Sequence, residues 1–72
     1  MNELDERIKS LEDNVKGLKN QLRRLKSSIN RLEKLELVIP NEILVKKDIV
    51  ENVLKENKQE LKALKKVVKL IN

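Results

Sequence analysis

The sequence predicts an all-α fold, an antiparallel coiled-coil helical hairpin that dimerises into a four-helix assembly. Three observations support this prediction. Aliphatic residues recur every three or four positions, 40% of the 72 residues are charged, and one proline, Pro40, divides the chain into two segments of similar length. A charge-rich chain with this apolar period is typical of coiled coils and long helices. We therefore expect a single domain, residues 1–72.

The first predicted helix covers about residues 2–36. From Leu4 to Leu32 its apolar side chains alternate steps of four and three residues without interruption. Leu occupies every d position of this heptad, and the flanking e and g positions are almost all polar. The apolar stripe is therefore a narrow coiled-coil seam rather than the wide face of a globular helix.

A turn of about residues 37–42 follows. The heptad breaks at Glu36, and the ring of Pro40 disfavours α geometry at the residue before it. The second predicted helix, about residues 43–71, carries a new heptad phase. Its start is open between a cap at Asn41 and a capping box beginning at Asp48. Continuity of the heptad favours the earlier start.

Two segments joined by a short break predict a helical hairpin. Pairing a with d positions places Ile8 opposite Ile71 and Leu22 opposite Asn57. Residues 1–15 hold five acids and two bases, whereas residues 62–72 hold four lysines and no acid, so opposite charges meet. The alternative is a long parallel dimer driven by the first helix.

Two slots of the second heptad are polar, Lys47 and Asn57. We expect Asn57 to set the register, because a buried Asn in a coiled coil fixes partner orientation at some cost in stability. Lys47 lies near the turn and can extend its ammonium group into water.

A second apolar stripe on the second helix predicts self-association. Around a twofold axis near Lys58, Ile49 of one copy would meet Val67 of the other, and Val53 would meet Ala63. The stripe is interrupted by two acids, Glu56 and Glu60, and consists of Ile49, Val53, Ala63, Val67 and Leu70. We therefore expect a homodimer of hairpins.

A basic stripe on the first helix is a candidate nucleic-acid contact, since residues 16–31 contain six bases and no acid. Such a stripe suits phosphate contacts that do not depend on base sequence. The alternative is a solvated coiled-coil flank, partly neutralised by acids of the second helix. The stripe comprises Lys16, Lys19, Arg23, Arg24, Lys26 and Arg31.

The turn is unusually apolar for a loop and is a candidate partner surface. The alternatives are a plug over the open end of the bundle or a part of the dimer interface. Its exposed aliphatic candidates are Val38, Ile39, Leu44 and Val45.

The segment Ile43-Leu44-Val45-Lys46-Lys47-Asp48, which runs into a charged amphipathic helix, resembles the strand-to-helix return of prefoldin subunits. Prefoldins are coiled-coil chaperones with β-hairpins between their two helices, so the resemblance implies a strand here and a chaperone activity. It covers about twenty residues, and the connector is shorter than the β-hairpins of that family.

Composition bounds the function. The chain has no Cys, His or aromatic residue, so it lacks thiolate and imidazole groups and base-stacking side chains. Since no nucleophile–base pair or glycine-rich phosphate loop appears, we expect no enzyme, cofactor, metal or small-molecule ligand. No apolar run reaches the roughly 18 residues of a membrane span. We expect an intracellular, cytoplasmic protein, complete from Met1 or an oligomerisation segment of a longer chain.

The leading functional hypothesis is a small self-associating interaction protein, an adaptor or regulator with an unidentified protein partner. The second is a nucleic-acid-binding helical bundle that uses the basic stripe. The third is a holdase-like chaperone that uses the apolar turn.

Overall fold

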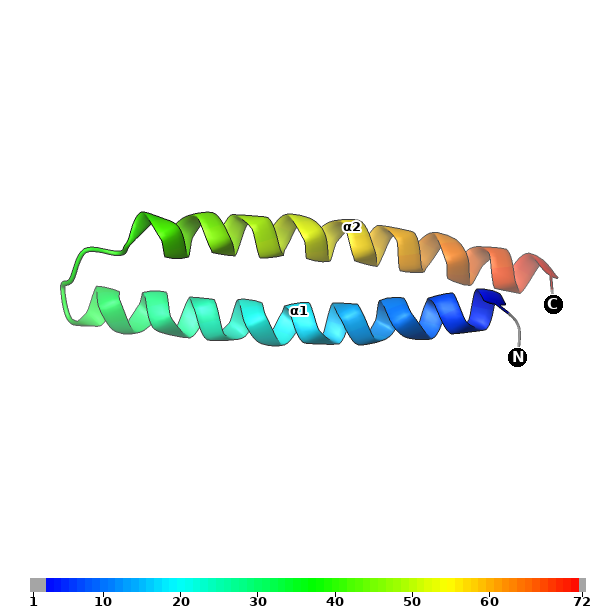
Figure 1. Ribbon diagram of the computed structural model, residues 1–72, viewed down its shortest axis with the longest axis horizontal. Coiled ribbons are helices and arrows are strands. Elements are labelled where there is room, and N and C mark those ends of the chain that lie inside the picture. Colours follow the sequence, from blue (N-terminus) through cyan, green and yellow to red (C-terminus); the bar gives the residue numbers. More distant parts are fainter. Residues whose placement is uncertain (1–2, 72) are drawn as a thin grey trace.

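The computed structural model describes residues 3–71 and shows two α-helices joined by a short loop (Figure 1). Helix α1 covers Glu3–Lys34 and helix α2 covers Asn41–Ile71. The helices run antiparallel, side by side, and form a rod of 54 × 16 × 15 Å measured on the Cα atoms. The all-α helical hairpin predicted from the sequence is confirmed.

Helix α1 ends two residues earlier than predicted because the chain turns at Glu36. The backbone of Glu36 is left-handed, with φ of 57°. Its N–H donates to the carbonyl of Glu33 at 3.0 Å, and the N–H of Leu37 donates to the carbonyl of Leu32 at 2.9 Å. These two bonds form a Schellman motif, which satisfies carbonyls that the helix end leaves without partners.

Helix α2 begins at Asn41, so the alternative start at Asp48 is excluded. The carbonyl of Pro40 accepts the first hydrogen bonds of the helix, from the N–H groups of Ile43 at 3.0 Å and Leu44 at 3.5 Å. Residues 43–48 are helical throughout. The strand implied by the prefoldin resemblance is therefore wrong, and residues 3–71 contain no β-strand.

The seam between the helices follows the predicted heptads. Among residues 3–71, every predicted a or d position is buried or half-buried except Ile71, which is 68% exposed. Outside the seam, the half-buried side chains of the described residues are Ile39 and Glu51. The most deeply buried side chains, 2–8% exposed, lie near the middle of the rod and are Leu11, Val15, Val50 and Leu54.

The predicted register of the two helices is wrong by one heptad. Arg7 Nη2 lies 2.6 Å from Glu60 Oε1. In the predicted register Arg7 would lie level with residue 72, and the twelve residues back to Glu60 span about 18 Å of helix, more than two side chains can bridge. A shift of seven residues keeps the seam intact and makes this ion pair possible.

A shift of seven residues aligns Ile8 with Leu64, Val15 with Asn57 and Leu22 with Val50 when the seam positions of the two antiparallel helices are matched in order. It also carries Ile71 past the start of α1, which explains its exposure.

Candidate functional site

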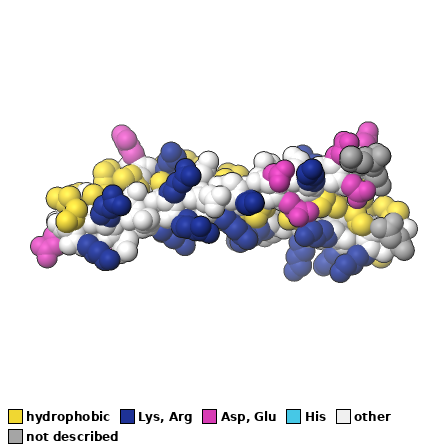
Figure 2. Space-filling model, turned by 90° about the horizontal axis from the view of Figure 1, so that it is seen from below, with side chains coloured by type: hydrophobic (Ala, Val, Ile, Leu, Met, Phe, Trp, Pro, Cys, Tyr) yellow, Lys and Arg dark blue, Asp and Glu magenta, His cyan; other side chains and the backbone are white. Residues whose placement is uncertain are grey.

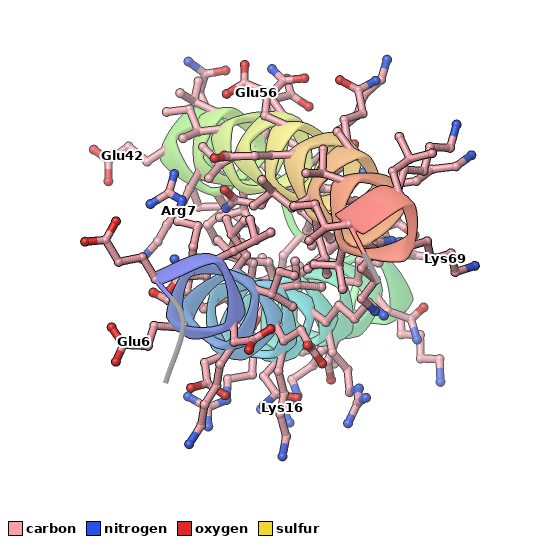
Figure 3. All side chains as sticks on the ribbon, turned by 90° about the vertical axis from the view of Figure 1, so that its right-hand side faces the viewer. Glu6, Arg7, Lys16, Glu42, Glu56 and Lys69 are labelled. Carbon is pink, nitrogen blue, oxygen red and sulfur yellow. The ribbon has the colours of Figure 1, made fainter. Side chains whose placement is uncertain are left out.

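The hairpin leaves two long side faces open. In the end-on view of Figure 3, Arg7 and Lys69 lie on opposite sides of the plane that contains both helices. Lys16 points away from α2, and Glu56 points away from α1 (Figure 3). We call the side of Lys69 the basic face and the side of Arg7 the apolar face, for the reasons given below.

The basic face carries a groove between the helices. Two adjoining hollows share Lys19 and Lys58, and their floors are seam residues such as Val15 and Leu61. The larger hollow has a volume of about 460 Å³. None of the described residues that line the two hollows is acidic. We define the basic groove by its cationic lining residues, Lys19, Arg23, Lys26, Lys58, Lys62, Lys65, Lys66 and Lys69.

Figure 2 shows Lys and Arg side chains in dark blue gathered along the lower edge of the rod. The edge draws on both helices, because α1 supplies three of the eight cations and α2 supplies five. The groove is thus a product of the hairpin and does not belong to either helix alone.

Three of the six residues of the predicted basic stripe of α1 line the basic groove, and the other three lie outside it. Lys19, Arg23 and Lys26 line the groove. Lys16 is exposed on the outer side of α1 (Figure 3). Arg24 and Arg31 are exposed and follow Gly17 at heptad intervals, so they lie towards the apolar face, where Gly17 lines a different hollow.

The sequence predicts a different role for the lysines of α2. It places residues 62–69 beside the acidic start of α1, where opposite charges would meet. Among residues 3–71 no ion pair joins these two segments; the two ion pairs are Arg7–Glu60 and Lys47–Glu51. The signal that locates them is their spacing. Lys58, Lys62, Lys65 and Lys69 repeat at steps of four and three, which places them on one helix face.

The acids proposed to neutralise the basic stripe do not line the groove. Glu60 lies on the opposite face with Arg7. Glu51 binds Lys47 on its own helix, with 3.4 Å between Oε1 and Nζ, and borders a neighbouring hollow. Glu56 points away from α1 (Figure 3). Among the described residues, the two hollows of the groove therefore have no acid in their lining, although the hollow of Glu51 shares Lys58 with them, so that this one acid borders the groove.

The apolar face carries the second stripe of α2, here called the apolar strip: Ile49, Val53, Ala63, Val67 and Leu70. All five side chains are exposed, from 39% for Val53 to 86% for Leu70. Beside Val53, the residues Gly17 and Gln21 of α1 line a shallow hollow, whose border also includes the acid Asp13. A Cβ atom added to Gly17 would meet no atom within 4 Å, so the surface there is open.

Asn57 lies in the seam and is half-buried. It lines the same hollow as Gly17 and Leu18, which agrees with a position opposite Val15 rather than Leu22. The predicted place of Asn57 in the seam is therefore confirmed. Its predicted role in setting the register stays a prediction.

The apolar turn is largely exposed. Val38 is 90% exposed, and Leu44 and Val45 are 39% and 47% exposed. Ile39 is half-buried. The turn therefore offers aliphatic surface at one end of the rod, and only Ile39 has the partial burial expected of a plug.

Comparison of the chain with protein-family models, with curated proteins and with solved structures found no match in any of the three. Neither α1 nor α2 contains a stretch apolar enough to span a membrane. Residues 3–71 contain no cluster of three potential metal-ligating side chains.

Proposed function

We propose that this protein is a self-associating helical hairpin, an adaptor or regulator that acts through protein surfaces and whose apolar strip binds the strip of a second copy. The observation that supports this proposal most is the concentration of exposed aliphatic side chains on one face. Ile49, Val53 and Val67 are 57%, 39% and 42% exposed, on a helix whose other side already forms the seam.

A lone hairpin buries little apolar surface. Among residues 3–71 only four side chains are buried, none of them completely, and a two-helix rod has no second layer to cover them. One long face of the rod measures 54 by about 16 Å, or roughly 800 Å², which is what a stable interface buries on each partner. A second hairpin on this face supplies the missing layer.

The strip matches itself around a twofold axis near Lys58. Antiparallel contact of two α2 helices places Ile49 level with Val67 and Val53 level with Ala63 of the second copy. The same arrangement brings Val45, near the turn, level with the exposed C-terminal turn that contains Leu70. The apolar surface at the two ends of the rod thereby becomes complementary.

Charge at the centre of this arrangement also supports it. Glu56 and Glu60 interrupt the strip, and Glu60 is already paired with Arg7 across the hairpin at 2.6 Å. In the dimer, Glu60 of one copy lies level with Glu56 of the other. Each Arg7 guanidinium then lies close to both carboxylates and reduces their repulsion.

The test is the substitution Val53→Glu, which places a carboxylate inside the proposed interface on both copies. We expect the dissociation constant of the dimer to rise roughly 100-fold or more, because two unpaired buried carboxylates cost several kcal/mol. Sedimentation velocity measures this change. Circular dichroism at high protein concentration checks that the helices remain.

The matched control is Gln59→Glu, which adds the same charge to α2 at an exposed position off the strip. We expect Gln59→Glu to dimerise like the parent chain. If Val53→Glu and Gln59→Glu sediment alike, the strip is not the interface and the proposal fails.

A further inference from the structure

The basic groove lies on the face opposite the apolar strip and takes no part in the self-association proposed above. We infer that it is a binding site for the phosphate backbone of a nucleic-acid duplex. Phosphodiester oxygens are the ligands that such a row of Lys and Arg side chains binds, by charge and without base recognition.

The charge of the groove is held in place by the fold. Lys19 and Lys58 come from different helices and line both hollows, so the two rows of cations meet at the middle of the groove. Each side chain rises from a half-buried or buried seam that supplies the floor, including Leu22 and Leu54. The cations therefore project from a preformed surface, and a ligand does not have to order the backbone on binding.

The length of the groove fits a duplex. In the observed register Lys26 lies level with residue 46 of α2, and Lys69 lies at the far end. The 23 residues between these levels span about 35 Å at 1.5 Å per residue. One helical turn of B-form DNA has nearly the same length, about 34–36 Å.

The face that carries the basic groove is too wide to enter a groove of the duplex. The Cα atoms of the two helices together span 16 × 15 Å, whereas the major groove of B-form DNA is about 12 Å wide. With both helices in contact, the hairpin is expected to rest across the phosphates that border a groove. Binding is expected to be independent of base sequence.

A duplex is favoured over a single strand for two reasons. Proteins that bind single strands stack bases on aromatic side chains, and this chain contains none. A duplex also carries a higher linear density of phosphate charge, which suits a straight row of cations.

The first measurement is fluorescence anisotropy of labelled 20-base-pair DNA and RNA duplexes titrated with the full chain at a series of salt concentrations. If four to eight of the groove cations contact phosphates, the slope of log K against log salt is expected to be about −4 to −7. Binding of either duplex supports the assignment. A single strand of the same sequence is expected to bind at least tenfold more weakly.

The second measurement compares two double variants of equal charge. Lys58→Glu with Lys62→Glu alters the groove, whereas Arg24→Glu with Arg31→Glu alters bases outside it, and both lower the formal net charge from +5 to +1. We expect the groove variant to lose at least tenfold more affinity than its control at the same salt, with a shallower slope.

Three results would overturn the inference. Equal loss in both variants would mean that net charge, not the groove, attracts the duplex. Absence of duplex binding at low salt would show that the groove is not a duplex site. Tighter binding to vesicles containing anionic lipid or to polyglutamate would assign the groove to another polyanion. Sedimentation of the groove variant as a dimer separates this outcome from a failure of self-association.

Discussion

Glu36 closes α1 in a backbone conformation that glycine adopts more easily. Its φ of 57° places it in the left-handed region, where a side chain crowds the following carbonyl. Glycine is the residue most often found at this position of a Schellman motif. The residue is exposed, so its side chain is not required for packing.

We therefore expect Glu36→Gly to stabilise the hairpin by about 1 kcal/mol, since the left-handed conformation costs a non-glycine residue about that much. Removal of a negative charge from the C-terminal end of α1 acts in the same direction. In a domain of this size such a gain raises the melting temperature by about 4–8 °C. Thermal unfolding followed by circular dichroism measures the shift.

The control is Glu33→Gly, three residues earlier and inside α1. There glycine is expected to destabilise the hairpin by about 1 kcal/mol, because the helix interior penalises it. Equal and negative shifts for both variants would show that Glu36 is not left-handed in solution.

At the scale of the helices, the sequence was sufficient to locate the seam. The unbroken alternation from Leu4 to Leu32 marks one buried side of α1, and the structure buries or half-buries each of those positions. The physical reason is that a strict heptad leaves only one side of a helix apolar. Only that side can be buried against the other helix without burying charged side chains.

The register was not recoverable from the seam. A shift of one heptad moves every a and d residue to an equivalent position, so the pattern has several equally good alignments. Two details decide between them. The left-handed residue at Glu36 ends α1 early, and the Arg7–Glu60 pair excludes the predicted alignment across the helices. The sequence does not predict the left-handed conformation of a glutamate, and it does not single out Arg7 and Glu60 among the many possible ion pairs.

Because the chain has no native Cys, introduced cysteine pairs can test the register. Leu22→Cys with Val50→Cys places the thiols opposite each other in the observed register. Leu22→Cys with Asn57→Cys does so only in the register one heptad away. We expect the first pair to form an intramolecular disulfide and the second to fail, because seven residues displace it by about 10 Å, beyond the reach of a disulfide.

Mass spectrometry of the oxidised monomer detects the intramolecular disulfide in each variant. The protein concentration is kept low enough to suppress exchange between chains. Preferential oxidation of the pair that includes residue 57 would restore the predicted register and with it the position of Asn57 opposite Leu22.

At the scale of the whole molecule, the hairpin has a basic face and an apolar face on opposite sides of the two helices. The half of the basic groove that belongs to α1 was visible in the sequence as Lys19, Arg23 and Lys26. The half from α2 was missed because its lysines also suited the acidic start of α1, and only three-dimensional proximity distinguishes the two roles. In the proposed dimer the two basic grooves point away from each other, since Lys69 of the groove and Arg7 of the apolar face lie on opposite sides of the hairpin (Figure 3).

The proposed association of two hairpins through α2 is tested by the molar mass of the protein in solution. Sedimentation equilibrium from about 1 to 100 μM should show a species of twice the 8.4 kDa chain mass, in a concentration range typical of specific complexes. The helical content and melting temperature should rise with concentration, because association stabilises the folded state by mass action. A fully helical species of 8.4 kDa across the whole range, with a melting temperature independent of concentration, would contradict the account.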